Sequence, residues 1–314
     1  MSNSQNIKEI IKAEYIKCAK DPIYFLKKYA VIQHPIDGKI PFSLYDFQEK
    51  TLEDFNKHNY NIILKARQLG ISTLVAGYSL WMMTFQTDKN ILVIATKQDT
   101  AKNLVTKIRV MHANLPNWVK SSCTEDNKLS LKYSNGSQVK AISSGEDSGR
   151  SEALSLLILD EASFIPKIDA IWTAAQSTLS TGGQCIALST PNGVGNWFHK
   201  TWAGAEEGKN DWNFIKLHWT VHPDREQDWR DDQDKLLGPS MAAQECDCSF
   251  ITSGQTVIDG VILEEYKNTH IEEPMEKRGF DSNLWIWRPP DYTQDYVLSA
   301  DVARGDGNDF SAFH

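Results

Sequence analysis

Apolar runs alternate with amphipathic segments along this chain, and the pattern predicts an α/β fold. The run at 90–96 is typical of a strand buried on both faces, and 154–159 predicts another buried strand. Shorter apolar strands are predicted at 62–64 and 185–188. Helices are expected over 74–85, 98–112 and 197–204, where apolar residues recur at helical spacing or form a long apolar stretch. Because strands and helices follow one another in turn, we expect a mainly parallel sheet covered by helices.

The segments before and between these runs have their own patterns. Residues 7–30 predict helices interrupted at Pro22, residues 34–42 predict a loop, and Leu44 opens a further helix. Residues 129–142 alternate as two strands around the turn signal Asn135-Gly136. A loop rich in Ser and Gly is expected from 143 to 151.

The last third of the chain changes in composition. Residues 223–236 are rich in acids and predict the start of a smaller, exposed subdomain. Pro289-Pro290 indicates a further boundary, and residues 296–303 predict a new strand. We therefore expect domains at 1–220, 221–289 and 290–314.

The stretch from Ile62 to Thr73 is similar to a phosphate-binding loop, with one departure. The usual loop, G-x-x-x-x-G-K-[ST], cradles phosphates with backbone N–H groups, and its lysine reaches the terminal phosphates. Gly70 and Ser72 keep their expected positions, but Lys65 stands at the first glycine and Ile71 at the lysine. A lysine at the end of the strand is long enough to reach the same phosphates from across the loop. The alternative is a buried strand, a turn and a core helix without a ligand.

Acidic and polar residues follow two of the other predicted strands. The run 156–159 ends in Asp160 and Glu161, an arrangement in which the first acid holds Mg²⁺ and the second polarises the attacking water. The next strand ends in Ser189, Thr190, Pro191 and Asn192, at the same expected edge of the sheet. Thr190 and Asn192 are candidates for sensing a γ-phosphate; the alternative is a Pro-Asn-Gly turn with no further role.

A glutamine with a nearby aromatic residue precedes the loop. Gln48 and Tyr45 have the spacing with which nucleotide motors bind adenine, the amide at the edge of the base and the ring against its face. A glutamine on a solvated helix face is the alternative.

Composition narrows the class of protein. With 314 residues, 41% of them hydrophobic, the chain is long enough for two domains. It has no run of ~18 apolar residues and no apolar N-terminal leader, so we expect a soluble, intracellular protein with no membrane partner. The five cysteines lack metal-binding spacing. The net charge of -8 argues against a protein that coats nucleic acid, although it leaves room for DNA contact by a local groove or by a ring of subunits.

Taken together, the motifs resemble the large terminase subunit of tailed bacteriophages, and its T-even-like branch in particular. The resemblance is carried by Asp21-Pro22-Ile23-Tyr24-Phe25, Leu44-Tyr45-Asp46-Phe47-Gln48, Lys65-Ala66-Arg67-Gln68-Leu69-Gly70, Ile158-Leu159-Asp160-Glu161-Ala162, Thr190-Pro191-Asn192-Gly193 and Tyr296-Val297-Leu298-Ser299-Ala300-Asp301. It implies a P-loop NTPase core of the RecA/ASCE type at 1–220, a small linker subdomain at 221–289 and the first strands of a ribonuclease H-like nuclease domain at 290–314. Ile71 departs from the T-even-like pattern, in which a lysine is more usual.

The resemblance also implies an ATP site with Mg²⁺. Glu161 would be the general base, and Ser72 and Asp160 would hold the metal. Arg67 would contact the γ-phosphate, unless it pairs with an acid at the sheet edge, and Arg150 would reach the ATP of a neighbouring subunit as an arginine finger. The residues expected around ATP are Gln48, Tyr45, Lys65, Arg67, Gln68, Leu69, Gly70, Ile71, Ser72 and Thr73, with Ser189, Thr190 and Asn192 for coupling.

For the C-terminal stretch, the resemblance implies that Asp301 and Asp309 belong to a nuclease site that binds Mg²⁺ or Mn²⁺. Asp306 is interpreted as a turn residue. Because the sequence stops at His314, within the second strand of that domain, we expect no nuclease activity from this chain alone.

As partners, the family implies double-stranded DNA, the portal protein, the small terminase subunit and other copies of the chain. It implies a pentameric ring when docked on the procapsid and a monomer in solution, in the host cytoplasm and absent from the mature virion. Two other functions stay open from the sequence: a helicase-like DNA-remodelling ATPase, and a scaffold that does not hydrolyse ATP, for which Ile71 is the only argument.

Overall fold

The structure is a computed structural model that divides the chain into two compact units, Met1–Glu264 and Glu265–His314. It describes residues 2–144, 153–180, 182–250, 262, 265–266, 269–279, 282–295, 297–301 and 312–313. The predicted boundaries at residues 220 and 289 do not coincide with this division. The first unit includes the acid-rich segment that was expected to start a separate subdomain.

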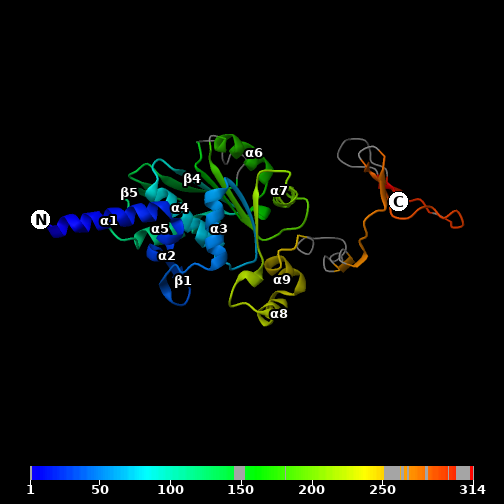
Figure 1. The fold of residues 1–314 in the computed structure, drawn as a ribbon, viewed down its shortest axis with the longest axis horizontal. Helices are drawn as coiled ribbons and strands as arrows, with labels where there is room; N and C mark the ends of the chain where they lie inside the picture. Colours follow the sequence, from blue (N-terminus) through cyan, green and yellow to red (C-terminus); the bar gives the residue numbers. More distant parts are fainter. Residues whose placement is uncertain are drawn as a thin grey trace. The chain divides into compact units, whose positions relative to one another are not determined.

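An eight-stranded, mostly parallel sheet forms the centre of the first unit (Figure 1), which confirms the predicted α/β fold. In spatial order the strands are β10 (Asn213–Leu217), β3 (Tyr60–Lys65), β9 (Gln184–Ser189), β8 (Leu156–Asp160), β4 (Asn90–Ala95), β7 (Gln138–Ser143), β6 (Ser130–Tyr133) and β5 (Cys123–Asp126). The first six are parallel to one another, whereas β6 is antiparallel to β7 and β5 is antiparallel to β6. The four predicted apolar runs are β3, β4, β8 and β9, the buried centre of the sheet.

Helices cover both faces of this sheet. The helices concerned are α3 (Asp46–Lys57), α4 (Ile71–Phe85), α5 (Gln98–Ala113), α6 (Ile168–Leu179) and α7 (Trp197–Glu206). The chain moves across the sheet in one direction through α4 and in the opposite direction through α6 and α7. Since parallel crossovers are right-handed, α4 belongs to one face and α6 and α7 to the other. The rings of Trp172 and Trp197, whose centroids lie 5.7 Å apart, join α6 to α7.

Two helices precede the sheet, as predicted. These are α1 (Ser2–Lys20) and α2 (Pro22–Tyr29). Asp21 ends the first and caps the second, because its side chain accepts a hydrogen bond of 3.0 Å from the backbone N–H of Tyr24. Pro22 fits the first helical position, where its missing N–H is not needed.

The loop predicted over 34–42 is wrong in part, because this segment contributes to a hairpin. Strand β1 (Val31–His34) pairs antiparallel with β2 (Gly38–Pro41). Gly38 supports the tight turn with a φ of 71°, a left-handed conformation that favours glycine. Pro35 lies between the strands and Pro41 at the end of the second, where a proline does not interrupt a ladder.

The acid-rich segment folds into helices of the first unit. They are α8 (Gln227–Leu237) and α9 (Pro239–Cys246), preceded by the 3-10 helix η2 (Trp219–Val221). The buried guanidinium of Arg230 holds α8 to the end of α9 by hydrogen bonds of 2.8 and 2.7 Å to the carboxylate of Asp247. A bidentate pair of this kind fixes the orientation of α9.

The second unit contains two short antiparallel pairs in its described part. Strand β11 (Glu276–Arg278) pairs with β12 (Leu284–Ile286), and β13 (Ala300–Asp301) pairs with β14 (Ala312–Phe313). Of the strand expected at 296–303, the described portion forms only β13. The ribonuclease H-like fold stays a prediction. In the described residues of both units, no helix is long and apolar enough to cross a bilayer.

Candidate functional site

The predicted phosphate loop connects the end of β3 to the start of α4. Gly70 has a φ of 72°, and a Cβ at this position would lie 2.7 Å from Nε2 of Gln48. Glycine is therefore required both for the backbone conformation and for the close approach of the glutamine. Leu69 and Ile71 flank it, and both are buried, so the loop is anchored from beneath.

A cavity of about 300 Å³ opens over this loop. Its lining residues are Lys65, Arg67, Gln68, Leu69, Gly70, Ile71, Ser72, Thr73, Lys107 and Glu161. Every loop residue predicted to surround ATP from Arg67 to Thr73 is in this set, together with Lys65 and Glu161. Lys107 was not identified from the sequence, because a lysine within the amphipathic helix α5 carries no motif.

Lys65 and Glu161 form an ion pair at the cavity. Nζ of Lys65 lies 3.3 Å from Oε1 of Glu161, and the lysine is buried. Glu161 follows β8 with a φ of 56°, a left-handed conformation that is uncommon for a residue with a side chain. Such conformations are found at functional sites, where the surrounding fold holds them.

Ser72 and Asp160 form the second polar pair of the site. Oγ of Ser72 donates a hydrogen bond of 3.2 Å to Oδ1 of Asp160. Burial and the neighbouring Glu161 raise the pKa of Asp160, and Lys65, Lys107 and the Ser72 hydroxyl oppose this shift. The hydroxyl and carboxylate oxygens suit Mg²⁺, which is held in such sites by one or two carboxylates plus phosphates and water. The pair therefore fits the predicted metal role.

Lys107 approaches the same cavity from α5. Burial lowers its pKa, and Lys65 adds to this effect, whereas the carboxylate of Asp160 opposes it. In the part of the chain that the structure describes, its ammonium group makes no hydrogen bond or ion pair. By contrast, Lys65 and Arg67, which also line the cavity, each form an ion pair.

Arg67 is paired with an acid, as the alternative interpretation expected, but the acid lies on α9 and not at the sheet edge. Its Nε lies 3.0 Å from Oε2 of Glu245, and its backbone N–H donates to the carbonyl oxygen of Glu245 at 2.8 Å. The Arg67 side chain is 64% exposed and still lines the cavity. The same group is therefore held by α9 and open to a ligand.

Arg225 supports the loop from outside, and it was not identified from the sequence. Its guanidinium donates hydrogen bonds of 3.0 Å to the carbonyl oxygen of Arg67 and 3.1 Å to that of Gln68. The same group lies 4.2 Å from the centre of the Trp229 ring. An arginine in an acid-rich segment gives no sequence signal for this role, which depends on where η2 and α8 lie.

Gln48 is buried, so a solvated helix face is the wrong interpretation for it. Its Nε2 donates to the carbonyl oxygen of Leu69 at 2.9 Å, and its Oε1 accepts from the backbone N–H of Tyr45 at 3.2 Å. Tyr45 stacks on Phe47 and lies near His222, with ring centroids 5.6 and 4.7 Å apart respectively. The pair thus lies beside the loop; adenine binding by it stays a prediction.

The predicted coupling residues meet the segment that follows Glu161. Ser163, in the 3-10 helix η1 (Ala162–Phe164), shares a hydrogen bond of 2.6 Å with Oγ of Ser189 and donates to the carbonyl oxygen of Thr190 at 2.7 Å. Nδ2 of Asn192 donates to the carbonyl oxygen of Ser163 at 3.1 Å. Ser163 was not identified from the sequence; a polar residue two positions after the acid pair is the signal that it offers.

Arg150, Asp301 and Asp309 are the remaining predicted residues. Arg150 and Asp309 fall outside the described residues. Asp301 ends β13 in the second unit, where its backbone is in register with Ala312.

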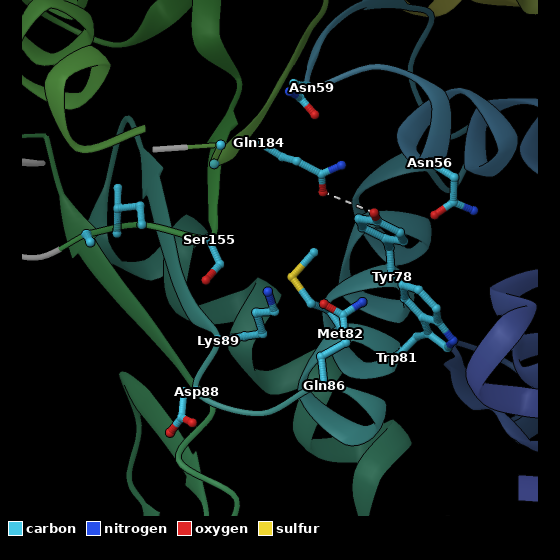
Figure 2. A pocket seen from close by; sticks show the side chains of 14 residues that line it. Asn56, Asn59, Tyr78, Trp81, Met82, Gln86, Asp88, Lys89, Ser155 and Gln184 are labelled. Carbon is cyan, nitrogen blue, oxygen red and sulfur yellow. Dashed lines mark hydrogen bonds between the residues drawn. The ribbon is translucent and has the colours of Figure 1, made fainter. Parts of the chain in front are cut away.

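A larger cavity of about 440 Å³ lies at the opposite edge of the sheet, where β4, β8 and β9 begin. Figure 2 shows polar side chains around it, among them Lys89, Ser155 and Gln184. The hydroxyl of Tyr78 donates to Oε1 of Gln184 at 3.1 Å. This cavity has no phosphate loop and contains none of the predicted site residues.

Comparison with known proteins gives the family. Residues 62–264, more than half of the chain, match the family described as "Terminase large subunit, T4likevirus-type, N-terminal". Two curated relatives, the large terminase subunits of Thermus phage G20c and Thermus virus P23-45, are 27% and 28% identical over 184 residues. Each alignment covers 53% of this chain and 35% of the relative, so the matched region is about a third of the relatives' length.

Solved structures agree on the fold. The large terminase ATPase domain of Thermus phage P74-26 is 21% identical with a TM-score of 0.54, over 67% of this chain and 95% of that one. The large terminase of a thermophilic bacteriophage, solved in complex with ADP, is 12% identical with a TM-score of 0.54, over 65% and 52%. The HK97 large terminase is 19% identical with the same TM-score, over 80% and 51%. Because the family match covers more than half of the chain, the chain belongs to the T4likevirus-type family of terminase large subunits.

Proposed function

We propose that this chain is an ATP-hydrolysing motor that moves double-stranded viral DNA into a procapsid. The observation that carries the proposal is the meeting of the pairs Lys65–Glu161 and Ser72–Asp160 at the cavity over the phosphate loop. Family membership supports it, as do solved relatives described as an ATPase domain or as complexes with ADP and ATP-γ-S. The alignments cover about a third of the length of the curated relatives, and the proposal concerns the activity of the whole protein.

Binding of the triphosphate follows from the cations and amides of the loop. Backbone N–H groups from Gln68 to Ser72 would cradle the phosphates, and Lys65 would reach them from the end of β3. Mg²⁺, held by Ser72 and Asp160 when it is bound, would neutralise charge on the phosphates. Because Ile71 is apolar and buried, no cation comes from the usual position.

Hydrolysis needs a base for the attacking water, and Glu161 suits this role. Its carboxylate is 3.3 Å from the Lys65 ammonium, and phosphates entering the cavity compete for that same ammonium. A lysine drawn toward the phosphates leaves Glu161 free to accept the proton of a water molecule. Nucleotide binding would therefore free the Glu161 carboxylate to act as the base.

Coupling to movement would run through the contacts that follow Glu161. Ser163 is two residues further along and hydrogen-bonds to Ser189, Thr190 and Asn192 at the end of the neighbouring strand. Loss of the γ-phosphate changes the charge beside Glu161, and this network would pass the change to β9. Thr190 and Asn192 are the proposed sensors.

Assembly and location complete the proposal. Copies of the chain would form a pentameric ring on the portal protein, with Arg150 of each copy completing the ATP site of its neighbour. The net charge of -8 is consistent with DNA held by a ring rather than coated along its length. The small terminase subunit would deliver the DNA in the host cytoplasm. Asp301 and Asp309 would bind Mg²⁺ or Mn²⁺ as part of a completed nuclease domain that cuts concatemeric DNA.

The test is steady-state ATP turnover by the parent chain, Glu161→Gln and Lys65→Ala. Loss of a general base is expected to lower turnover by about 10²- to 10⁴-fold, with nucleotide binding retained. Loss of the lysine is expected to weaken binding about 10-fold or more. Glu207→Gln is the control, since its carboxylate pairs with Lys209 away from the loop. Parental rates in both site variants would overturn the assignment.

A scaffold that does not hydrolyse ATP is the second candidate, and the buried Ile71 is what favours it. Nucleotide binding with and without Mg²⁺, measured on the parent and on Lys65→Ala, tests it: binding of ATP by Lys65→Ala as tightly as by the parent would favour the scaffold over the motor. DNA encapsidation into purified empty heads, dependent on this protein, separates the motor from a helicase-like ATPase.

A further inference from the structure

Lys107 lies on α5 (Gln98–Ala113). It lines the cavity over the phosphate loop together with Ser72 and Glu161. It also lines, with Thr73, an adjoining groove of about 450 Å³ beside the β1–β2 hairpin. Its side chain is therefore at the junction of the loop cavity with a second hollow.

The three cations of the cavity differ in their partners. Lys65 is 3.3 Å from Glu161, and Arg67 is 3.0 Å from Glu245. Lys107 has no such partner in the described part of the chain. A lysine that is mostly removed from water normally acquires an anionic partner, because desolvation of its charge is costly.

The position of Lys107 complements the departure of the loop from its usual sequence. At Ile71 the loop has a buried apolar residue where a lysine usually contacts the terminal phosphates. Lys65 supplies one cation to the cavity from the end of β3. Lys107 would supply a second from α5, so that two ammonium groups would contact the terminal phosphate.

We propose that Lys107 binds the terminal phosphate of the nucleotide and supplies from α5 the charge that Ile71 does not. This inference rests on the proposed function, since it assumes that a nucleoside triphosphate enters the cavity. It assigns to Lys107 a direct contact with the γ-phosphate, the group that distinguishes ATP from ADP.

The experiment compares the affinities of the chain for ADP and for a non-hydrolysable ATP analogue, both with Mg²⁺. The variants are Lys107→Met, which keeps the length of the stem without its charge, Lys107→Gln and Lys107→Arg. Lys102→Met is the matched control on the same helix, because Lys102 interacts with Asp99 and does not line the cavity. Melting temperature is measured for each variant to establish that it folds.

Lys107→Met and Lys107→Gln are expected to weaken binding of the ATP analogue about 10-fold or more, as loss of a charge-assisted hydrogen bond predicts. Binding of ADP should change much less, and Lys107→Arg should recover part of the affinity. Lys102→Met should match the parent. A purely structural lysine would instead affect both nucleotides equally.

An unchanged ratio of the two affinities in a folded Lys107 variant would overturn the inference and leave the proposed function intact. Loss of discrimination that Lys107→Arg does not restore at all would also contradict a role for the charge. If the parent chain binds neither nucleotide, the proposed function fails, and this inference fails with it.

Discussion

Nε of Arg67 lies 3.0 Å from Oε2 of Glu245, which joins the phosphate loop to α9. The neighbouring residue of α9, Gln244, donates a hydrogen bond of 3.0 Å from its Nε2 to the carbonyl oxygen of Pro191. Two consecutive residues of one helix thus contact the phosphate loop and the end of β9. Because α9 contacts both, a displacement of the loop at Arg67 is expected to shift the segment at Pro191, and the reverse.

Glu245→Gln should release Arg67 and strengthen nucleotide binding. The carboxylate competes with phosphate for the guanidinium, whereas a neutral amide competes poorly. Affinity for a non-hydrolysable ATP analogue is expected to rise about 3- to 10-fold, since the pair is partly exposed and screened by solvent. Isothermal titration calorimetry measures it, with Glu207→Gln as the control. Weaker binding would mean that Glu245 positions Arg67 for the phosphates instead of withholding it.

Arg225→Ala should weaken binding of ATP and ADP by the same factor. Arg225 lies outside the set of cavity-lining residues, but it holds the carbonyl oxygens of Arg67 and Gln68 and so orders the loop. We expect a several-fold loss for both nucleotides and a lower melting temperature. Arg225→Lys should recover little, because one ammonium group does not reproduce the planar pair of donors. A loss confined to ATP would point to a direct phosphate contact and contradict this role.

Gly70→Ala should be more harmful than Gly38→Ala. Both glycines have a left-handed φ, 72° and 71°, so alanine is strained at each by roughly 1–2 kcal/mol. Only at Gly70 would the added Cβ meet another group, Nε2 of Gln48 at 2.7 Å; at Gly38 nothing lies within 4 Å. Urea unfolding of both variants measures the difference, and nucleotide binding should fail only in Gly70→Ala. Equal losses of stability would show that the approach of Gln48 is unimportant.

Glu14 should make folding stability depend on pH in the acid range. Its Oε1 accepts hydrogen bonds of 2.7 Å from Lys28, Tyr24 and Tyr29, and these contacts lower its pKa from 4.5 to about 2. A carboxyl whose pKa is lower in the folded protein stabilises it above the unfolded pKa, and this contribution is lost as pH falls from 4.5 toward 2.

Urea midpoints of the parent and Glu14→Gln between pH 2 and 7 test this dependence. The parent should be the more stable at pH 7, and the difference should vanish near pH 2. Glu9→Gln on the same helix is the control, since Glu9 makes no hydrogen bond or ion pair within the described residues. A difference that is constant over the whole range would contradict the assignment.

Much of the fold followed from local sequence. Strands buried on both faces must be apolar throughout, so the runs that became β3, β4, β8 and β9 were recognisable without any knowledge of their neighbours. Edge strands such as β10 were not, because alternate residues face solvent and the apolar signal is diluted. The hairpin was missed because residues 34–42, with Pro35, Gly38 and Pro41, have the composition of a loop.

The sequence by itself determined that the predicted phosphate loop, the acid pair Asp160-Glu161 and the polar residues after Leu188 lie at one edge of a parallel sheet, since each directly follows its own strand. Only the tertiary structure decided which side chains meet there. Arg225 hydrogen-bonds to Arg67, from which it is 158 residues distant in sequence. Lys107 lines the same cavity as the loop from α5. Such contacts depend on how helices pack over the sheet, a property of the whole fold that no local pattern encodes.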